Sequence, residues 1–125
     1  MANARRLTQW LLLAVVILLV VAQFIPVERT NPPGDPAQDV AARLQVPAAV
    51  SAVFDRSCRD CHSNATTWPW YSRVAPASWV LADDVKEGRS HMNLSEWGGL
   101  DDRRAANKLE EICEEVSSGS MPDWK

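Results

Sequence analysis

The chain has 125 residues and a formal net charge of −3, and 46% of its residues are hydrophobic. This length allows one small domain and an additional segment. A mildly acidic chain argues against nucleic acid as a partner, and an odd count of three cysteines does not suit a framework of disulfides.

Residues 1–26 predict a transmembrane anchor. The run Leu7–Ile25 carries no charge, and a helix of that length spans about 28 Å, close to the hydrocarbon thickness of a bilayer. Arg5 and Arg6 precede the run, which predicts a cytoplasmic N-terminus and a domain on the periplasmic side of the inner (cytoplasmic) membrane. The lipid bilayer is thus an expected partner. A cleaved signal peptide is the alternative, but the run is long for one and lacks a clear cleavage site.

Residues 27–43 predict an extended linker, since prolines are frequent between Pro26 and Gln38. Residues 44–125 then form the folded domain, and no segment has the pattern of a strand. We therefore predict an all-α fold, in which the transmembrane helix is followed by a small domain of three helices.

The first domain helix is expected to begin at Pro47. The second is expected to run from about Pro76 to Glu87 and to stop at Gly88. The third begins after Asp101, a good N-cap, and ends at residues 117–119. Its apolar side consists of Ala105, Leu109, Ile112 and Val116.

The run Cys58-Arg59-Asp60-Cys61-His62 is a C-x-x-C-H motif. Two thiols one helical turn apart can each form a thioether with a vinyl group of haem, and the histidine that follows then becomes an axial ligand of the iron. The spacing of Val50 and Phe54 places both cysteines on an apolar helix stripe. The motif therefore predicts one covalently attached haem c, held by Cys58, Cys61 and His62.

Two other interpretations of the motif are weaker. A thiol–disulfide site is normally carried by a βαβ unit, and no such pattern is present. A zinc site could combine the two cysteines with His62 or His91, but a closed structural site needs four ligands. The remaining cysteine, Cys113, is expected to be a small buried hydrophobic residue.

Three residues are candidates for the sixth position of the iron. Met121 is preferred because it follows a helix end and Pro122 stiffens the backbone behind it. His91 and Met92 are the alternatives, and an open sixth position would suit a different function.

An aromatic group follows the motif, and it is expected to line a haem pocket. Its members are Trp68, Trp70, Tyr71 and Trp79. Arg73 and Arg89 are candidates for contact with a haem propionate, or they are surface residues.

Residues 40–125 resemble the bacterial haem-binding domain family. The resemblance rests on Cys58–Asn64, Trp68–Ser72, Val74–Pro76, Ser78–Trp79, Asp84–Val85, Gly88–Arg89, Asn93, Ser95–Trp97 and Gly119-x-Met121-Pro122. It implies a small exported, membrane-anchored protein with a cytochrome c-like haem domain. Similar proteins usually continue into a further helix beyond this point, so we expect this domain to lack a C-terminal helix.

The expected function is single-electron transfer, with Cys58 and Cys61 holding the ring and His62 and Met121 binding the iron. The protein is then not an enzyme, and its redox partner is another protein. The alternative is a gas or peroxide sensor, or a weak peroxidase, with an open sixth position. A third hypothesis is a haem that only stabilises part of a larger complex.

Overall fold

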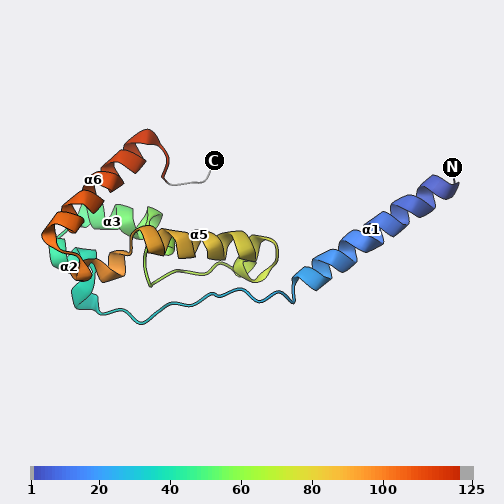
Figure 1. The fold of residues 1–125 in the computed structure, drawn as a ribbon, viewed down its shortest axis with the longest axis horizontal. Helices are drawn as coiled ribbons and strands as arrows, with labels where there is room; N and C mark the ends of the chain where they lie inside the picture. Colours follow the sequence, from blue (N-terminus) through green and yellow to red (C-terminus); the bar gives the residue numbers. More distant parts are fainter. Residues whose placement is uncertain (1, 122–125) are drawn as a thin grey trace. The chain divides into compact units, whose positions relative to one another are not determined.

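The computed structural model describes residues 2–121, and all regular elements in this range are helices (Figure 1). The predicted all-α class is therefore confirmed. The α-helices are α1 (Ala2–Ala22), α2 (Val40–Leu44), α3 (Ala48–Ser57), α4 (Arg59–His62), α5 (Ala77–His91) and α6 (Asp102–Ser118). The 3-10 helices are η1 (Pro36–Gln38), η2 (Trp70–Arg73) and η3 (Leu94–Gly99).

The chain divides into two compact units. One, which we call the anchor unit, combines residues up to 29 with residues 69–82. The other, which we call the cysteine unit, combines residues 30–68 with residues from 83 onward. Helix α5 begins in the anchor unit and ends in the cysteine unit.

Helix α1 is the predicted anchor. Within residues 2–121 it is the one helix long and apolar enough to cross a bilayer, and no part of Asn3–Ala22 is buried by protein. Length and composition alone support this assignment, and a signal sequence would meet the same criteria.

Helix α3 begins one residue after the predicted start at Pro47, and α6 follows the predicted N-cap Asp101. Pro47 is the N-cap of α3. The side chain of Asp101 accepts a hydrogen bond from the Arg104 backbone N–H at 2.8 Å and so caps α6. Gly119 ends α6 in the left-handed conformation with φ of 74°, which a residue without Cβ adopts at little cost.

The prediction that Gly88 stops the second domain helix is wrong. Helix α5 continues through Gly88 to His91, and Gly119 is the one glycine with positive φ in the described chain. Gly88 is instead needed for a close contact, because a Cβ there would lie 2.7 Å from the backbone oxygen of Cys61. Helix α5 therefore passes directly against the C-x-x-C-H turn.

The hydrophobic core of the cysteine unit is built on Val40, Leu94 and Trp97. Residues packed against these three come from α3, α6 and the segments between; they include Phe54, Cys58, Met92, Ala105 and Ile112. Val40 is fully buried, although it belongs to the range 27–43 that was expected to be a linker. That part of the range is packed into the domain.

Cys113 is exposed, so the prediction that it is buried is wrong. Helix α6 directs Ala105 and Ile112 toward the core. Since successive residues of an α-helix are rotated by about 100°, the neighbour of Ile112 points away from that contact.

Candidate functional site

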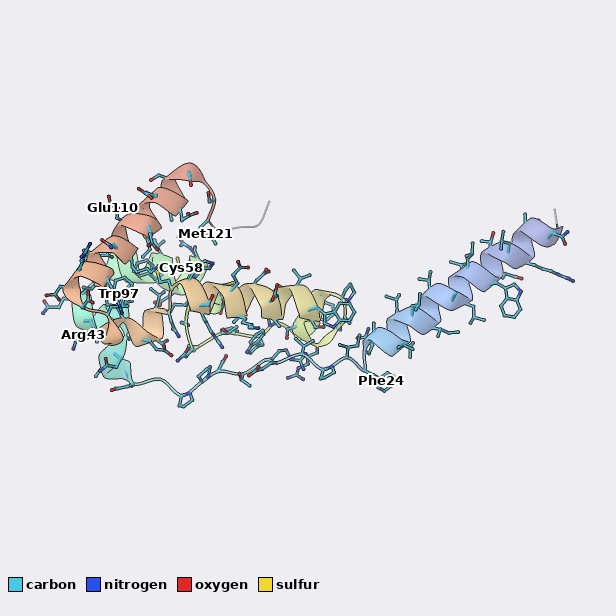
Figure 2. All side chains as sticks on the ribbon, in the orientation of Figure 1. Phe24, Arg43, Cys58, Trp97, Glu110 and Met121 are labelled. Atoms are coloured by element: carbon cyan, nitrogen blue, oxygen red, sulfur yellow. The ribbon has the colours of Figure 1, made fainter. Side chains whose placement is uncertain are left out.

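The C-x-x-C-H turn is a single turn of helix that follows α3. The backbone N–H groups of Cys61 and His62 both donate to the carbonyl of Cys58, at 3.3 and 2.9 Å. Cys58 and Cys61 are free and half-buried, and Figure 2 marks Cys58 at the end of α3. The three predicted residues Cys58, Cys61 and His62 are thus brought together on one local element.

Burial raises the pKa of both thiols. For Cys58 it is the cause, and for Cys61 the negative charges of Asp84 and Asp60 add to it. The two sulfurs are therefore neutral thiols at neutral pH, with little of the thiolate form that reacts with oxidants and disulfides.

The imidazole of His62 is held by two backbone carbonyls. Its Nδ1 lies 2.9 Å from the oxygen of Gly88 and 3.2 Å from that of Met92. Because carbonyl oxygens only accept hydrogen bonds, Nδ1 must carry the proton. In the neutral ring the lone pair is then on Nε2, which points away from the last turn of α5 and is the atom able to bind a metal.

Replacing Gly88 by alanine tests how closely α5 and the motif approach each other. The new Cβ would be 2.7 Å from the Cys61 oxygen, so one backbone must move and the hydrogen bond to His62 weakens. Overpacking of this kind costs about 1–3 kcal/mol, which exceeds the gain of about 1 kcal/mol that alanine brings inside a helix. We expect Gly88→Ala to lower the free energy of unfolding, measured by chemical denaturation.

Gly99→Ala is the matched control, because no atom lies within 4 Å of a Cβ at that position. It should leave stability within about 0.5 kcal/mol of the unsubstituted protein. Equal effects of the two substitutions would contradict the close approach at Gly88.

Arg89 joins the segment after the motif to two other parts of the cysteine unit. Its guanidinium donates to the carbonyl of Ser63 at 2.7 Å and to the Thr66 hydroxyl at 2.8 Å. It also donates to the carbonyl of Thr30 at 2.8 Å and to the side-chain oxygen of Asn31 at 3.1 Å. Arg89 is thus a structural cross-link inside the cysteine unit, and its contact with a haem propionate stays a prediction.

Buried polar residues continue this network. Ser63, Asn64 and Thr66 are all less than a tenth exposed. The Asn64 backbone N–H donates to the Ser95 hydroxyl at 3.1 Å, and the Asn64 side-chain oxygen accepts from Asn93 at 2.8 Å. The segment after the motif is therefore held against η3 and against Asn93, the N-cap residue of η3. These buried polar groups find their hydrogen-bond partners inside the protein.

Arg59, the first residue between the two cysteines, anchors the motif on its other side. It donates two hydrogen bonds to the carboxylate of Asp39, at 2.7 and 2.9 Å, and one to Asp55 at 2.6 Å. The hydrogen bonds from Arg59 hold the pKa of Asp39 below its ordinary value, and Asp39 in turn raises the pKa of Arg59.

We expect Asp39→Asn to lower the free energy of unfolding by about 1–2 kcal/mol at neutral pH, because the charge-assisted pair with Arg59 is lost. The folded-state pKa of Asp39 lies below its ordinary value of 3.8. The stabilisation is therefore complete above that pH and is lost as the pH falls through the folded-state pKa. Denaturation curves at neutral and acidic pH should show that the difference in free energy of unfolding between Asp39→Asn and the unsubstituted protein is smaller in acid.

Asp55→Asn is the control for this pair. The Asp55 side chain is 59% exposed, so its ion pair with Arg59 is screened by water and is worth less than about 1 kcal/mol. If Asp55→Asn lowers the free energy of unfolding as much as Asp39→Asn does, the stabilising role assigned to the Arg59–Asp39 pair is contradicted.

Apolar side chains of α3 and α6 are incompletely covered by protein. Val50 and Val53 of α3 are 44% and 46% exposed, and Leu109 and Val116 of α6 are 40% and 57% exposed. The indole Nε1 of Trp97 is buried in the core without a hydrogen-bond partner in the described chain. Apolar side chains exposed in this way commonly mark a surface that another group covers.

The candidates for the sixth position lie in different places. Met121 is 41% exposed and follows the end of α6 (Figure 2), where its backbone N–H donates to the Glu115 carbonyl at 3.1 Å. Pro122, the residue expected to stiffen this turn, lies outside the described residues. His91 is in the last turn of α5 with an exposed side chain near Glu87, and Met92 follows it.

The predicted aromatic group is divided between the two units, with Trp68 in the cysteine unit. Trp70, Tyr71 and Trp79 belong to the anchor unit, and Trp70 is 78% exposed. Trp68 donates to the side chain of Asn31. Trp97, which was not expected to line the site, belongs to the core cluster against which Cys58 and Phe54 pack. The sequence signal that could have identified Trp97 is its position in the Ser95-Glu96-Trp97 run, which begins two residues after Asn93.

A zinc site at the motif finds no support. Within residues 2–121, no three His, Cys, Asp or Glu side chains converge to hold a metal ion. A closed structural zinc site requires four such ligands.

Comparison with known proteins gave one match. The model of the haem-binding domain family matches residues 17–125, which include all of the motif, its hydrogen-bond network and Met121. No curated protein and no solved structure matches the chain.

Proposed function

Since the chain belongs to the haem-binding domain family, we propose that it holds one haem covalently through Cys58 and Cys61, with His62 binding the iron. The observation that carries this proposal is the hydrogen bonding of His62 Nδ1 to the carbonyls of Gly88 and Met92. It fixes the ring and leaves Nε2 as the ligand atom. A histidine that binds metal is usually oriented by a second hydrogen bond of this kind.

The surroundings of the motif fit this group. Both cysteines are free and lie on one helical turn. The half-exposed apolar side chains of α3 and α6 would be covered by a large flat apolar ring. Such a ring would also enlarge a core that is small for the size of the domain.

The thiols have the protonation state that attachment needs. Each cysteine would add its sulfur to one carbon of a vinyl group and its hydrogen to the other carbon. No electrons leave the two reactants, so the step needs no oxidant. The raised pKa values of Cys58 and Cys61 keep both groups as thiols before attachment.

Met121 is the favoured sixth ligand. The carbonyl of Met92 bonds to Nδ1 of His62, so the last turn of α5 lies on the side of the ring opposite Nε2. The backbone of His91 and Met92 is therefore behind the imidazole, on the side away from the atom that would bind iron. Met121 is free of this restriction, since the chain turns at Gly119 after α6.

The function that follows is single-electron transfer at a membrane. Haem iron supplies the one-electron chemistry, and methionine with histidine as its ligands raises the reduction potential. The residues of the motif would hold the haem and its iron, and an electron carrier of this kind catalyses no reaction of its own, so the proposal is of a protein that is not an enzyme. Helix α1 would hold it in the inner membrane with the haem domain in the periplasm, where it exchanges electrons with a partner protein.

Optical spectra of the full chain matured with a haem c assembly system test this proposal. The reduced protein should have the sharp α band of a six-coordinate low-spin haem, and the oxidised protein a weak sulfur-to-iron band in the far red. A high-spin spectrum that shifts with carbon monoxide would point to a gas or peroxide sensor, or a weak peroxidase. Protein without any haem would refute the proposal.

A further inference from the structure

The anchor unit exposes large apolar side chains outside the helix that spans the membrane. We call this set the interfacial residues; its members, 44–82% exposed, are Phe24, Ile25, Trp70, Tyr71, Val74 and Val80. Trp70 and Tyr71 pack edge to face with ring centres 5.8 Å apart. Apolar side chains exposed together in one compact unit commonly mark a surface that another molecule or a membrane covers.

The segment 69–76 is attached directly to the end of α1. The side chain of Gln23 accepts from the backbone N–H of Ala75 at 2.9 Å and donates to the Ala75 carbonyl at 3.2 Å. Arg29 donates to the carbonyl of Ser72. Gln23 follows the last residue of α1 (Ala22), so Ala75 is held within one side-chain length of the helix end.

This attachment determines the depth of the segment if α1 crosses the bilayer. A run of the length of Leu7–Ile25 is about as long as the hydrocarbon is thick. Its C-terminal end, where Figure 2 labels Phe24, then lies at the boundary between acyl chains and headgroups. Ala75 lies at the same level because it is bonded to Gln23.

The residue types suit that level. Tryptophan and tyrosine favour the membrane interface, since their rings are apolar and their N–H and O–H groups stay in contact with water. Arg29 and Arg73 border one cavity together with Gln23 and Ser78, which places two positive charges where lipid phosphates are found.

We propose that residues 69–80 lie in the headgroup region of the same bilayer that α1 crosses, with Trp70, Tyr71 and Val74 against lipid. This inference rests on the proposed membrane anchor. The anchor unit then contacts the membrane through two parts of the chain, which restricts its tilt and rotation.

The test uses the full-length haem protein in nanodiscs of phosphatidylcholine and phosphatidylglycerol. Cys113→Ser removes the exposed thiol, and a polarity-sensitive dye is attached to one new cysteine at a time. Val74→Cys and Val80→Cys probe the proposed contact and leave Trp70 and Tyr71 in place. Ile17→Cys, inside α1, and Glu110→Cys, exposed on α6 (Figure 2), are the controls for lipid and water.

The labels at 74 and 80 should emit at shorter wavelength than the label at 110, and lipids with a nitroxide near the headgroup should quench them. Adding Trp70→Ser and Tyr71→Ser should reverse the shift at 74 without affecting the haem spectrum. The inference is refuted if the labels at positions 74 and 80 emit like the label at 110 while the label at 17 emits as it would in lipid. That result would leave the proposed anchor intact.

Two further outcomes would also refute the inference. A label at 17 that reports water would refute the anchor itself, and the inference with it. The emission of the label at 74 could instead shift only in discs that hold two chains, without quenching by the nitroxide lipids. That result would show that a second copy of this chain covers the surface.

Discussion

A Cys58→Ala, Cys61→Ala double variant is expected to lose all haem on denaturing electrophoresis, where the unsubstituted protein retains haem stain. Thioethers from these two sulfurs are the only covalent links that the proposal allows. The two cysteines are neighbours on one turn, so each single variant should still retain haem through the other sulfur. Mass spectrometry should show the mass of one haem on the unsubstituted chain and on each single variant.

The same experiment separates attachment from binding. His62 and the apolar residues near it remain in the double variant, so haem added to the folded protein should still bind reversibly. Cys113→Ala is the control, because Cys113 is exposed on α6 and should not affect haem retention. Haem stain that survives in the double variant would refute covalent attachment at the motif, although the chain would remain a haem-binding protein.

A Met121→Ala variant is expected to change the iron from low-spin to a high-spin or solvent-bound state, and to lower its reduction potential. The thioether stabilises Fe(II), and axial ligands together set haem potentials over a range of roughly 0.8 V. Potentiometric titration monitored by absorbance measures both effects. The variant should also bind carbon monoxide faster, because no protein ligand must leave first.

Met92→Leu is the matched control for Met121→Ala. It removes the thioether of Met92 but retains the backbone carbonyl that accepts from His62, and it conserves apolar volume. Its spectrum should match that of the unsubstituted protein. If Met121→Ala leaves the spectrum unchanged and His91→Ala converts it to high-spin, the ligand assignment is wrong.

The helices of the domain were largely predictable because their signals are local. Asp101 and Gly119 act at the ends of α6 through bonds to residues within one turn, and Pro47 precedes α3. Gly88 was misassigned for the same reason. A glycine inside a helix looks like a stop unless the backbone that it approaches, here that of Cys61, is known.

Burial was harder to predict than helix position. The apolar stripe of α6 was expected to include Cys113 at its edge, yet Cys113 is exposed and Ile112 packs on the core. Trp70 was expected to line a haem pocket, and its side chain is 78% exposed within the anchor unit. An aromatic residue can pack wherever the fold leaves an apolar surface, so composition near a motif does not locate a pocket wall.

The sequence by itself determined what depends on neighbouring residues. The spacing of Cys58, Cys61 and His62 specifies two thiols and an imidazole on one helical turn, and the uncharged run Leu7–Ile25 specifies a helix of membrane length. Only the tertiary structure decided what surrounds them. The carbonyls of Gly88 and Met92 that orient His62 are 26 and 30 residues away. Backbone carbonyls are the same in every residue, so no side-chain pattern could have predicted which ones His62 meets.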